Sequence, residues 1–185
     1  MLATDHIVIV DENDLEIGVG EKLLVHLHGI QHRAFSVFVI NAKGQLLLQR
    51  RAMDKYHSAG LWTNTCCSHA LPNTDIETVV HERIQAEMGF DCPIQWLFKF
   101  SYKVGFENGL IENEIDHVYL GFYDGNPLPE PSEVCEWKWL SFAEIVNEIE
   151  QKPEDFTYWF RHVFQTFVSE YNKLNNLALL DISND

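Results

Sequence analysis

The sequence has no hydrophobic run long enough to cross a membrane. Apolar residues make up 46% of its 185 positions, yet no stretch approaches the roughly 20 consecutive apolar residues that a membrane-spanning helix needs. Residues 1–6 do not form a charged segment followed by an apolar run, so we expect no secretory signal peptide. Internal repeats and low-complexity tracts are also lacking. We therefore expect a soluble cytoplasmic protein with no membrane partner.

Cysteine is scarce. Its four positions, Cys66, Cys67, Cys92 and Cys135, match neither a secreted disulfide framework nor the paired CxxC spacing of a structural zinc site. A chain of 185 residues buries about two-thirds of its unfolded surface and needs no disulfide to be stable. We expect reduced thiols and a single domain over residues 1–176, followed by a loose tail at 177–185.

Positive charge is also scarce, and it is unevenly distributed. Lys and Arg number 13 against 28 Asp and Glu, giving a net charge of −15, which argues against a nucleic-acid partner. Residues 22–69 are the exception, because they contain six cations, one acid and five of the nine histidines. A cationic, imidazole-rich region on an acidic protein suits a small polyanion as its ligand. The alternative is that these residues scatter in the folded chain.

The hydrophobic pattern predicts an α+β protein in which a mixed sheet is sandwiched by flanking helices. Strands are expected at residues 6–10, 33–40, 45–50, 61–67, 95–104, 112–123 and 136–140. Residues 74–77 and 141–144 match the capping box that begins a helix, and Gly89 suits the end of the first of these helices. A last helix is expected from about residue 155 to residue 174.

Two of the expected strands place reactive groups on one face. Residues two apart in a strand point to the same side, so Cys67 and His69 share a face, as do Glu112, Glu114 and Asp116. Neighbouring carboxylates repel each other unless a cation or a proton lies between them, and a divalent metal ion removes this cost. A solvated strand face is the simpler alternative.

Three histidines, His26, His28 and His32, lie close together in the sequence. Imidazole is the commonest transition-metal ligand, although this spacing does not form the HExxH motif. The segment fits either a flexible loop or a helix with two of these imidazoles on one face. A site of imidazoles and carboxylates would suit manganese, zinc or magnesium. The histidines outside the expected site, His57, His81, His117 and His162, are interpreted as surface or satisfied core residues.

The helix expected after residue 74 carries Arg83 and Glu87 four positions apart, which fits an ordinary ion pair on a helix surface. Residues 71–90 lie where a Nudix box, GX5EX7REUXEEXGU, would fall. Aligned on Gly89, only Glu87 and this glycine match the box. A Nudix hydrolase needs several carboxylates on this helix for its metal ions, so hydrolysis is disfavoured.

From about residue 6 to residue 172, the sequence resembles the type I isopentenyl-diphosphate delta-isomerases, a family with a Nudix-like fold. The resemblance rests on EK at 21–22, HRAFS at 32–36, NAKGQL at 41–46, RRA at 50–52, WTNTCCSH at 62–69 and ENE at 112–114. It implies an isomerase that interconverts isopentenyl and dimethylallyl diphosphate. In this family the double bond moves by protonation and deprotonation through a tertiary carbocation.

The resemblance also implies a role for each matching residue. A divalent ion, manganese, zinc or magnesium, is bound by His26, His32, His69, Glu112 and Glu114. Cys67 and Glu114 are the opposed acid and base, with Tyr102 assisting the glutamate and Trp159 facing the reacting carbons. The substrate diphosphate is bound by Lys22, Arg51, Lys55 and Arg83, and a second ion, Mg²⁺, is bound by Glu87. His28 is an additional imidazole that competes with His26 for the first ligand position.

Three classes of function remain open at this stage. The favoured one is a metal-dependent isomerase of a small prenyl diphosphate, acting as a monomer or a weak dimer. The second is a Nudix-type hydrolase, and the third is a non-catalytic metal-binding module. Cys67 counts against the third, because a purely structural site of histidine and glutamate has no use for a reactive thiol. Without the resemblance, Cys67 and Trp159 would be interpreted as core residues.

Overall fold

The computed structural model describes residues 6–55 and 57–182, with side chains described as far as residue 176. Its strands are β1 His6–Val10, β2 Glu16–Glu21, β3 His32–Ile40, β4 Leu46–Arg51, β5 Trp62–Thr63, β6 Cys66–His69, β7 Ile94–Gly105, β8 Ile111–Phe122 and β9 Val134–Leu140. Its helices are α1 Lys22–His28, α2 Ile76–Met88, α3 Phe142–Gln151, the short 3-10 helix η1 Pro153–Asp155, and α4 Tyr158–Ile182. Each predicted strand has a counterpart in this order, and the predicted α+β class is confirmed.

Strand β3 organises the sheet. It runs parallel to β8 along its whole length, from His32 opposite Glu114 to Ile40 opposite Phe122. Its middle part pairs antiparallel with β6, which places Cys67 opposite Ser36. The hairpin of β7 and β8 and the pair of β4 and β9 extend the sheet further. Residues from four distant segments of the chain therefore meet around β3.

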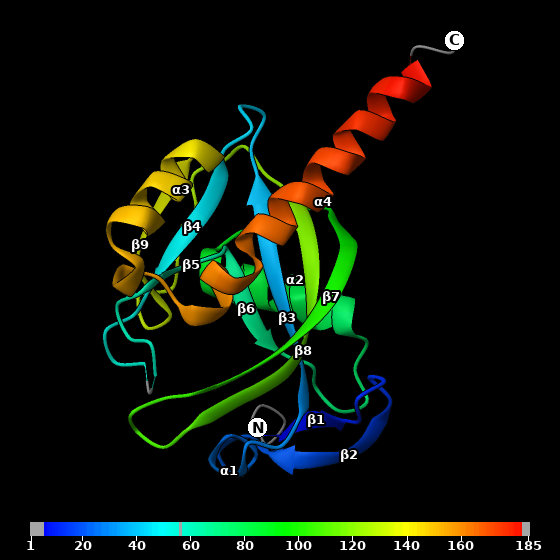
Figure 1. Ribbon diagram of the computed structural model, residues 1–185, viewed down its shortest axis with the longest axis vertical. Helices are drawn as coiled ribbons and strands as arrows, with labels where there is room; N and C mark the ends of the chain where they lie inside the picture. The colour runs from blue at the N-terminus through cyan, green and yellow to red at the C-terminus, as the bar shows by residue number, and fades with distance from the viewer. Residues whose placement is uncertain (1–5, 56, 183–185) are drawn as a thin grey trace.

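Both faces of the sheet are covered by helices, as Figure 1 shows, with α4 crossing one face and α2 lying behind the other. Phe38 and Ile40 of β3 pack into one core with the aromatic residues of α4. Val37 and Val39 pack into a second core with α2. This alternation follows from the period of two in a strand, so a continuous apolar run such as β3 serves two cores at once.

The helix ends agree with the sequence in part. Gly89 ends α2 with a φ of 73°, and Ser141 and Glu144 form the expected capping box of α3. The capping box at residues 74–77 is wrong, because the side chain of Asp75 accepts the hydrogen bond from the Thr78 backbone N–H. The Thr74 hydroxyl instead donates to the carbonyl of Pro72. A helix can use either residue as its N-cap, and here the chain enters one residue later.

The expected strand at 61–67 is divided into β5 and β6. Between them, the Asn64 side-chain amide donates to the carbonyls of Val37 and Cys66, and Thr65 N–H donates to the carbonyl of Val37. These polar contacts interrupt the expected strand and separate β5 from β6.

The segment from Glu16 to His28 contains β2 and α1, two elements that the hydrophobic pattern does not predict. The Glu21 carboxylate caps α1 by accepting from the Leu23 and Leu24 N–H groups, and Gly29 ends it with a φ of 58°. His28 is therefore the last residue of a helix, and His32 begins β3. The alternative of one helix that carries both His28 and His32 on one face is therefore wrong.

Helix α4 continues to Ile182, past the expected end at residue 174 and through most of the segment expected to be loose. Residues 174–182 contain neither glycine nor proline, and leucine and alanine favour a helix. Residues 183–185 of the expected tail lie outside the described residues. Among the described helices, none combines the length and hydrophobicity needed to cross a bilayer.

Candidate active site

A cavity of about 320 Å³ is lined by residues of strands β3, β4, β6, β7 and β8 and of helices α1, α2 and α4. Most of the residues singled out in the sequence line it together: Lys22, Arg51, Lys55, Cys67, His69, Arg83, Glu87, Tyr102, Glu112, Glu114 and Trp159. Its volume is within the range of small-molecule sites. Cys67 and Glu114, which come from β6 and β8, thus share one cavity.

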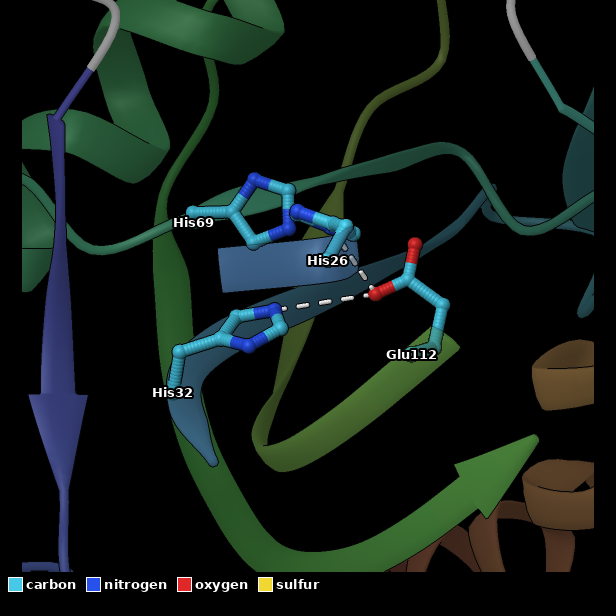
Figure 2. Close-up of side chains that lie close together, drawn as sticks. All are labelled: His26, His32, His69 and Glu112. Atoms are coloured by element: carbon cyan, nitrogen blue, oxygen red, sulfur yellow. Dashed lines mark ion pairs between the residues drawn. The ribbon is translucent and has the colours of Figure 1, made fainter. Parts of the chain in front are cut away.

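Three imidazoles and a carboxylate lie close together (Figure 2), and two of these residues, His69 and Glu112, line the cavity. His26 comes from the last turn of α1, His32 from the start of β3, His69 from the end of β6 and Glu112 from β8, and their ligand atoms lie within 4.8 Å of one another. Glu114 adjoins them, with Oε1 at 3.4 Å from Nε2 of His32 and 3.2 Å from Nε2 of His69. The five expected metal ligands are therefore together, while His28 is exposed outside the cluster.

The hydrogen bonds around two of these imidazoles prepare them as metal ligands. Nδ1 of His26 lies 2.6 Å from the carbonyl of Lys22, and Nδ1 of His32 lies 2.9 Å from the carbonyl of Ile30. When Nδ1 carries the proton, Nε2 presents a lone pair to the cluster. Nε2 of His32 and Oε2 of Glu112 are buried and accept or donate no hydrogen bond among the described residues. This donor set fits a divalent metal ion.

The electrostatics of the cluster favour a bound cation. Burial opposes ionisation of Glu112, but the imidazoles of His26, His32 and His57 close to its carboxylate hold its pKa well below the ordinary value. Burial also disfavours a charged His32, yet the carboxylates of Glu112 and Glu114 raise its pKa to about 10. Burial and the charges of Lys22 and His32 lower the pKa of His69 to about 4. The ionised carboxylates of Glu112 and Glu114 therefore surround the imidazole of His32 and favour its positive charge.

Cys67 is partly buried and packs against the apolar core, and polar side chains contact its thiol. Its Sγ donates to Oδ1 of Asn64 at 3.0 Å and lies 3.6 Å from the hydroxyl of Ser36, which in turn donates to Asp116 at 2.7 Å. Burial and the charge of Asp116 raise the pKa of the thiol to about 12, so the thiol keeps its proton at neutral pH. Cys66 points to the other face and packs in the core against α2, as strand alternation predicts.

Two aromatic residues complete the wall of the cavity. The hydroxyl of Tyr102 donates to Oε2 of Glu114 at 2.7 Å. Trp159 packs in the core of α4 and also lines the cavity, with the Arg51 guanidinium 5.4 Å from the centroid of its ring. Trp159 is therefore both a core residue and part of the cavity wall, as the two interpretations from the sequence expected.

Four cations line the side of the cavity formed by α1, α2 and the end of β4. They are Lys22, Arg51, Lys55 and Arg83. Burial lowers the pKa of Lys22, and the positive charges of Arg83, Lys55 and Arg51 lower it further. The neighbouring carboxylate of Glu133 pairs with Lys55 and lies 3.4 Å from Arg83.

The cationic segment 22–69 is only partly collected here. Arg33 pairs with Asp14 at 2.7 Å, and Arg50 pairs with Glu136 at 3.3 Å, both away from the cavity. Glu87 does line the cavity, where its carboxylate accepts from Arg83 at 2.6 Å and from the Gln49 side chain at 3.1 Å. The pair of Arg83 and Glu87 is thus part of the cavity wall rather than an ordinary surface ion pair.

Four further residues line the cavity although no sequence pattern assigns them to a site: His57, Glu133, Gln49 and Ser36. His57 was set aside as a surface or core residue, but it lines the cavity and its Nε2 lies 3.0 Å from Oε1 of Glu112. No local pattern signals Glu133, because it reaches the site only through the pairing of β9 with β4. Asp116 did have a signal, the alternation with Glu112 and Glu114.

A family model described as the NUDIX domain matches residues 30–161. Among solved structures, DR0079 from Deinococcus radiodurans superposes with a TM-score of 0.66 at 16% identity, covering 79% of this chain and 89% of its own. The fold is therefore that of a Nudix domain. The chain therefore has the Nudix fold although only Glu87 and Gly89 of the Nudix box are present.

Relatives of higher identity define the family more closely. Isopentenyl-diphosphate Delta-isomerase 2 of Aromatoleum aromaticum is 43% identical over 155 residues, covering 84% of this chain and 82% of its own length. Isopentenyl-diphosphate Delta-isomerase of Pectobacterium atrosepticum is 43% identical over 174 residues, covering 90% and 97%. The chain belongs to the isopentenyl-diphosphate delta-isomerase family of Nudix proteins. The resemblance seen in the sequence is confirmed.

Proposed function

We propose that the protein interconverts isopentenyl diphosphate and dimethylallyl diphosphate. The observation that carries this proposal is the shared cavity, in which a protonated thiol, a buried carboxylate and a group of four cations face the same space. Membership of the isomerase family supports it. The cations match the charged head of a prenyl diphosphate, and the thiol and the aromatic wall match its small apolar tail.

The reaction transfers one proton to the substrate and removes another. The terminal methylene carbon of isopentenyl diphosphate takes a proton, and its alkene electron pair forms the new C–H bond. The tertiary carbon next to it becomes a cation. A base then removes a proton from the neighbouring methylene group on the diphosphate side, and that electron pair forms the new double bond. No oxidant, reductant or water is consumed, so the site needs only an acid, a base and the exclusion of solvent.

Cys67 and Glu114 are proposed as the two groups that exchange these protons. Tyr102 donates to Oε2 of Glu114 and thereby fixes the orientation of this carboxylate. Trp159 presents its π system to the cationic carbon, an interaction of about 0.5–2 kcal/mol. This is a small part of the barrier, so positioning of the substrate and exclusion of water supply much of the remainder.

A divalent ion, zinc, manganese or magnesium, is proposed for His26, His32, His69, Glu112 and Glu114. When bound, it neutralises the two carboxylates and shifts the proton affinity of Glu114. The diphosphate is proposed to bind Lys22, Arg51, Lys55 and Arg83, and its binding energy holds the tail against the reacting groups. Glu87 is proposed as the protein carboxylate that would hold the Mg²⁺ accompanying the diphosphate, since Mg²⁺ favours carboxylate and phosphate oxygens.

Incubation with isopentenyl diphosphate and Mg²⁺ in deuterated water tests the proposal. We expect dimethylallyl diphosphate that carries deuterium in a methyl group, detected by NMR and mass spectrometry. Release of inorganic phosphate or diphosphate without a shifted double bond would instead identify a Nudix hydrolase. A substrate recovered unchanged and without deuterium would leave a metal-binding module as the better description.

A further inference from the structure

His57 is an imidazole of the cavity that the proposed reaction does not use. It lies between β4 and β5 and is 9% exposed. Its ring stacks on Phe106 with centroids 4.9 Å apart and meets the Trp159 ring edge-on at 5.9 Å. The carbonyl of His57 accepts a hydrogen bond from Arg51 at 3.3 Å. The ring is therefore held from two sides, and its backbone is held as well.

The two oxygens of Glu112 face different partners. Oε2 lies 3.1 Å from Nε2 of His26 and 3.6 Å from Nε2 of His32, within the imidazole cluster. Oε1 lies 3.0 Å from Nε2 of His57, outside that cluster. With Nε2 protonated, His57 donates to Oε1 and leaves Oε2 directed toward the histidines. Nδ1 of His57 lies 3.4 Å from the Ser58 hydroxyl, which agrees with this tautomer.

Glu114 is held in the same way by a different donor. Its Oε2 accepts from the Tyr102 hydroxyl at 2.7 Å, while its Oε1 faces His32 and His69. Each carboxylate of the cluster therefore has one oxygen bound by a neighbouring donor and one oxygen turned toward the imidazoles. His57 therefore contacts Glu112 as Tyr102 contacts Glu114, which is not expected of a histidine that merely fills space in the core.

We propose that His57 is a positioning residue of the metal centre, which fixes the carboxylate of Glu112 through Oε1 so that Oε2 is presented as a metal ligand. The inference rests on the metal site of the proposed function. Donors that orient a ligating carboxylate or imidazole typically contribute a factor of about 10–100 to metal affinity. Without this donor, Glu112 can rotate about its last torsion, and ordering it again reduces the affinity for the ion.

The test measures the affinity of the metal-free protein for Zn²⁺ by competition with a chelating indicator. His57→Phe keeps a flat ring between Phe106 and Trp159 but lacks the N–H donor, and we expect it to weaken Zn²⁺ binding about 10–100-fold. His57→Gln restores an amide N–H, and we expect it to recover most of the loss. His117→Phe is the matched control, because His117 also pairs with a carboxylate, Asp14 at 2.8 Å, but lies outside the cavity lining.

The outcomes separate this inference from the metal site on which it rests. Wild-type protein that binds no Zn²⁺ would overturn the metal centre itself. Normal wild-type binding together with a His57→Phe affinity within threefold of it would overturn the positioning role alone. A loss that Gln does not restore, accompanied by a matching fall in the melting temperature of the metal-free protein, would assign His57 a structural role instead. If His57→Phe does not fold, His57→Met serves as the donor-free variant.

Discussion

The hydroxyl of Tyr102 lies 2.7 Å from Oε2 of Glu114, and the two residues are direct partners across β7 and β8. Both residues are buried, at 8% and 6% exposure. Burial and the charge of Glu114 raise the pKa of Tyr102 well above its ordinary value, so the phenol remains a donor at every working pH. The register of one hairpin thus sets the orientation of a proposed catalytic carboxylate.

Replacement of Tyr102 by Phe is expected to lower kcat about 10–100-fold while the protein stays folded. The change removes a hydrogen bond to a charged group, which is worth about 1.5–3 kcal/mol, and leaves the ring in place. Steady-state isomerisation kinetics and circular dichroism measure the two properties. Tyr158→Phe is the control, because the Tyr158 ring lies 6.0 Å from that of Tyr102 and does not line the cavity. Equal kcat values for the two variants would contradict the role of the hydroxyl.

Replacement of Cys67 by Ala is expected to reduce isomerisation by about 10²–10⁴-fold, the range for loss of a general acid or base. Binding of the diphosphate should persist, because the cations are untouched, and isothermal calorimetry with inorganic diphosphate measures it. Cys92→Ala is a matched control, since Cys92 is another buried thiol with a pKa raised by burial, to about 11, but lies outside the cavity lining. Near-normal turnover of the Cys67 variant would remove the thiol from the mechanism.

Replacement of Lys55 by Ala is expected to raise KM about tenfold or more, because one charge-assisted contact to the diphosphate is lost. The effect on kcat should be smaller, because Lys55 is proposed to bind the diphosphate and takes no part in the proton transfers. Lys43→Ala, in the exposed turn between β3 and β4, is the control for loss of one positive charge. A KM for the Lys55 variant that matches this control would exclude Lys55 from the diphosphate site.

Removal of metal by a chelator is expected to lower the melting temperature and abolish isomerisation, and Zn²⁺ or Mn²⁺ should restore both. A ligand present at about 100 times its Kd stabilises a protein by roughly 2.7 kcal/mol, which corresponds to about 5–10 °C for a chain of this size. Differential scanning fluorimetry measures the shift. Glu112→Gln should show no metal-dependent shift, and an identical shift in that variant would place the ion elsewhere.

Asp14 is expected to make stability fall in acid. Burial disfavours its charge, but hydrogen bonds from Arg33, Lys99 and His117 lower its pKa in the folded protein. Because the folded pKa lies below the unfolded value of about 3.9, this contribution is present at neutral pH and is lost as pH falls from about 4 through the folded pKa.

The variant that tests this effect is Asp14→Asn, because asparagine tolerates the left-handed backbone at φ 66°. We expect a melting temperature about 2–8 °C lower at pH 7, from the loss of charge-assisted contacts. The difference from wild type should shrink as pH falls below about 4, measured by thermal unfolding across that range. A difference that stays constant with pH would exclude Asp14 as its source.

Short-range patterns predicted the fold well where one period dominates a segment. The continuous apolar run of β3, the alternation of Glu112 and Glu114, and the capping box at Ser141 each depend on local geometry, and each has its expected place. Segments 16–28 and 61–67 were predicted less well. In these, a side-chain cap from Glu21 and the hydrogen bonds of Asn64 to distant carbonyls override the local pattern.

The residues of the proposed site could be named from the sequence because the resemblance to the isomerase family matches each of them at a definite position in the chain. Their mutual arrangement was not available. Glu133 reaches the cavity through the pairing of β9 with β4, and His57 through its contacts with Glu112 and Trp159. Such contacts depend on tertiary packing rather than on neighbours in the chain. The sequence by itself determined which chemical groups the protein has, and packing around β3 decided which of them meet.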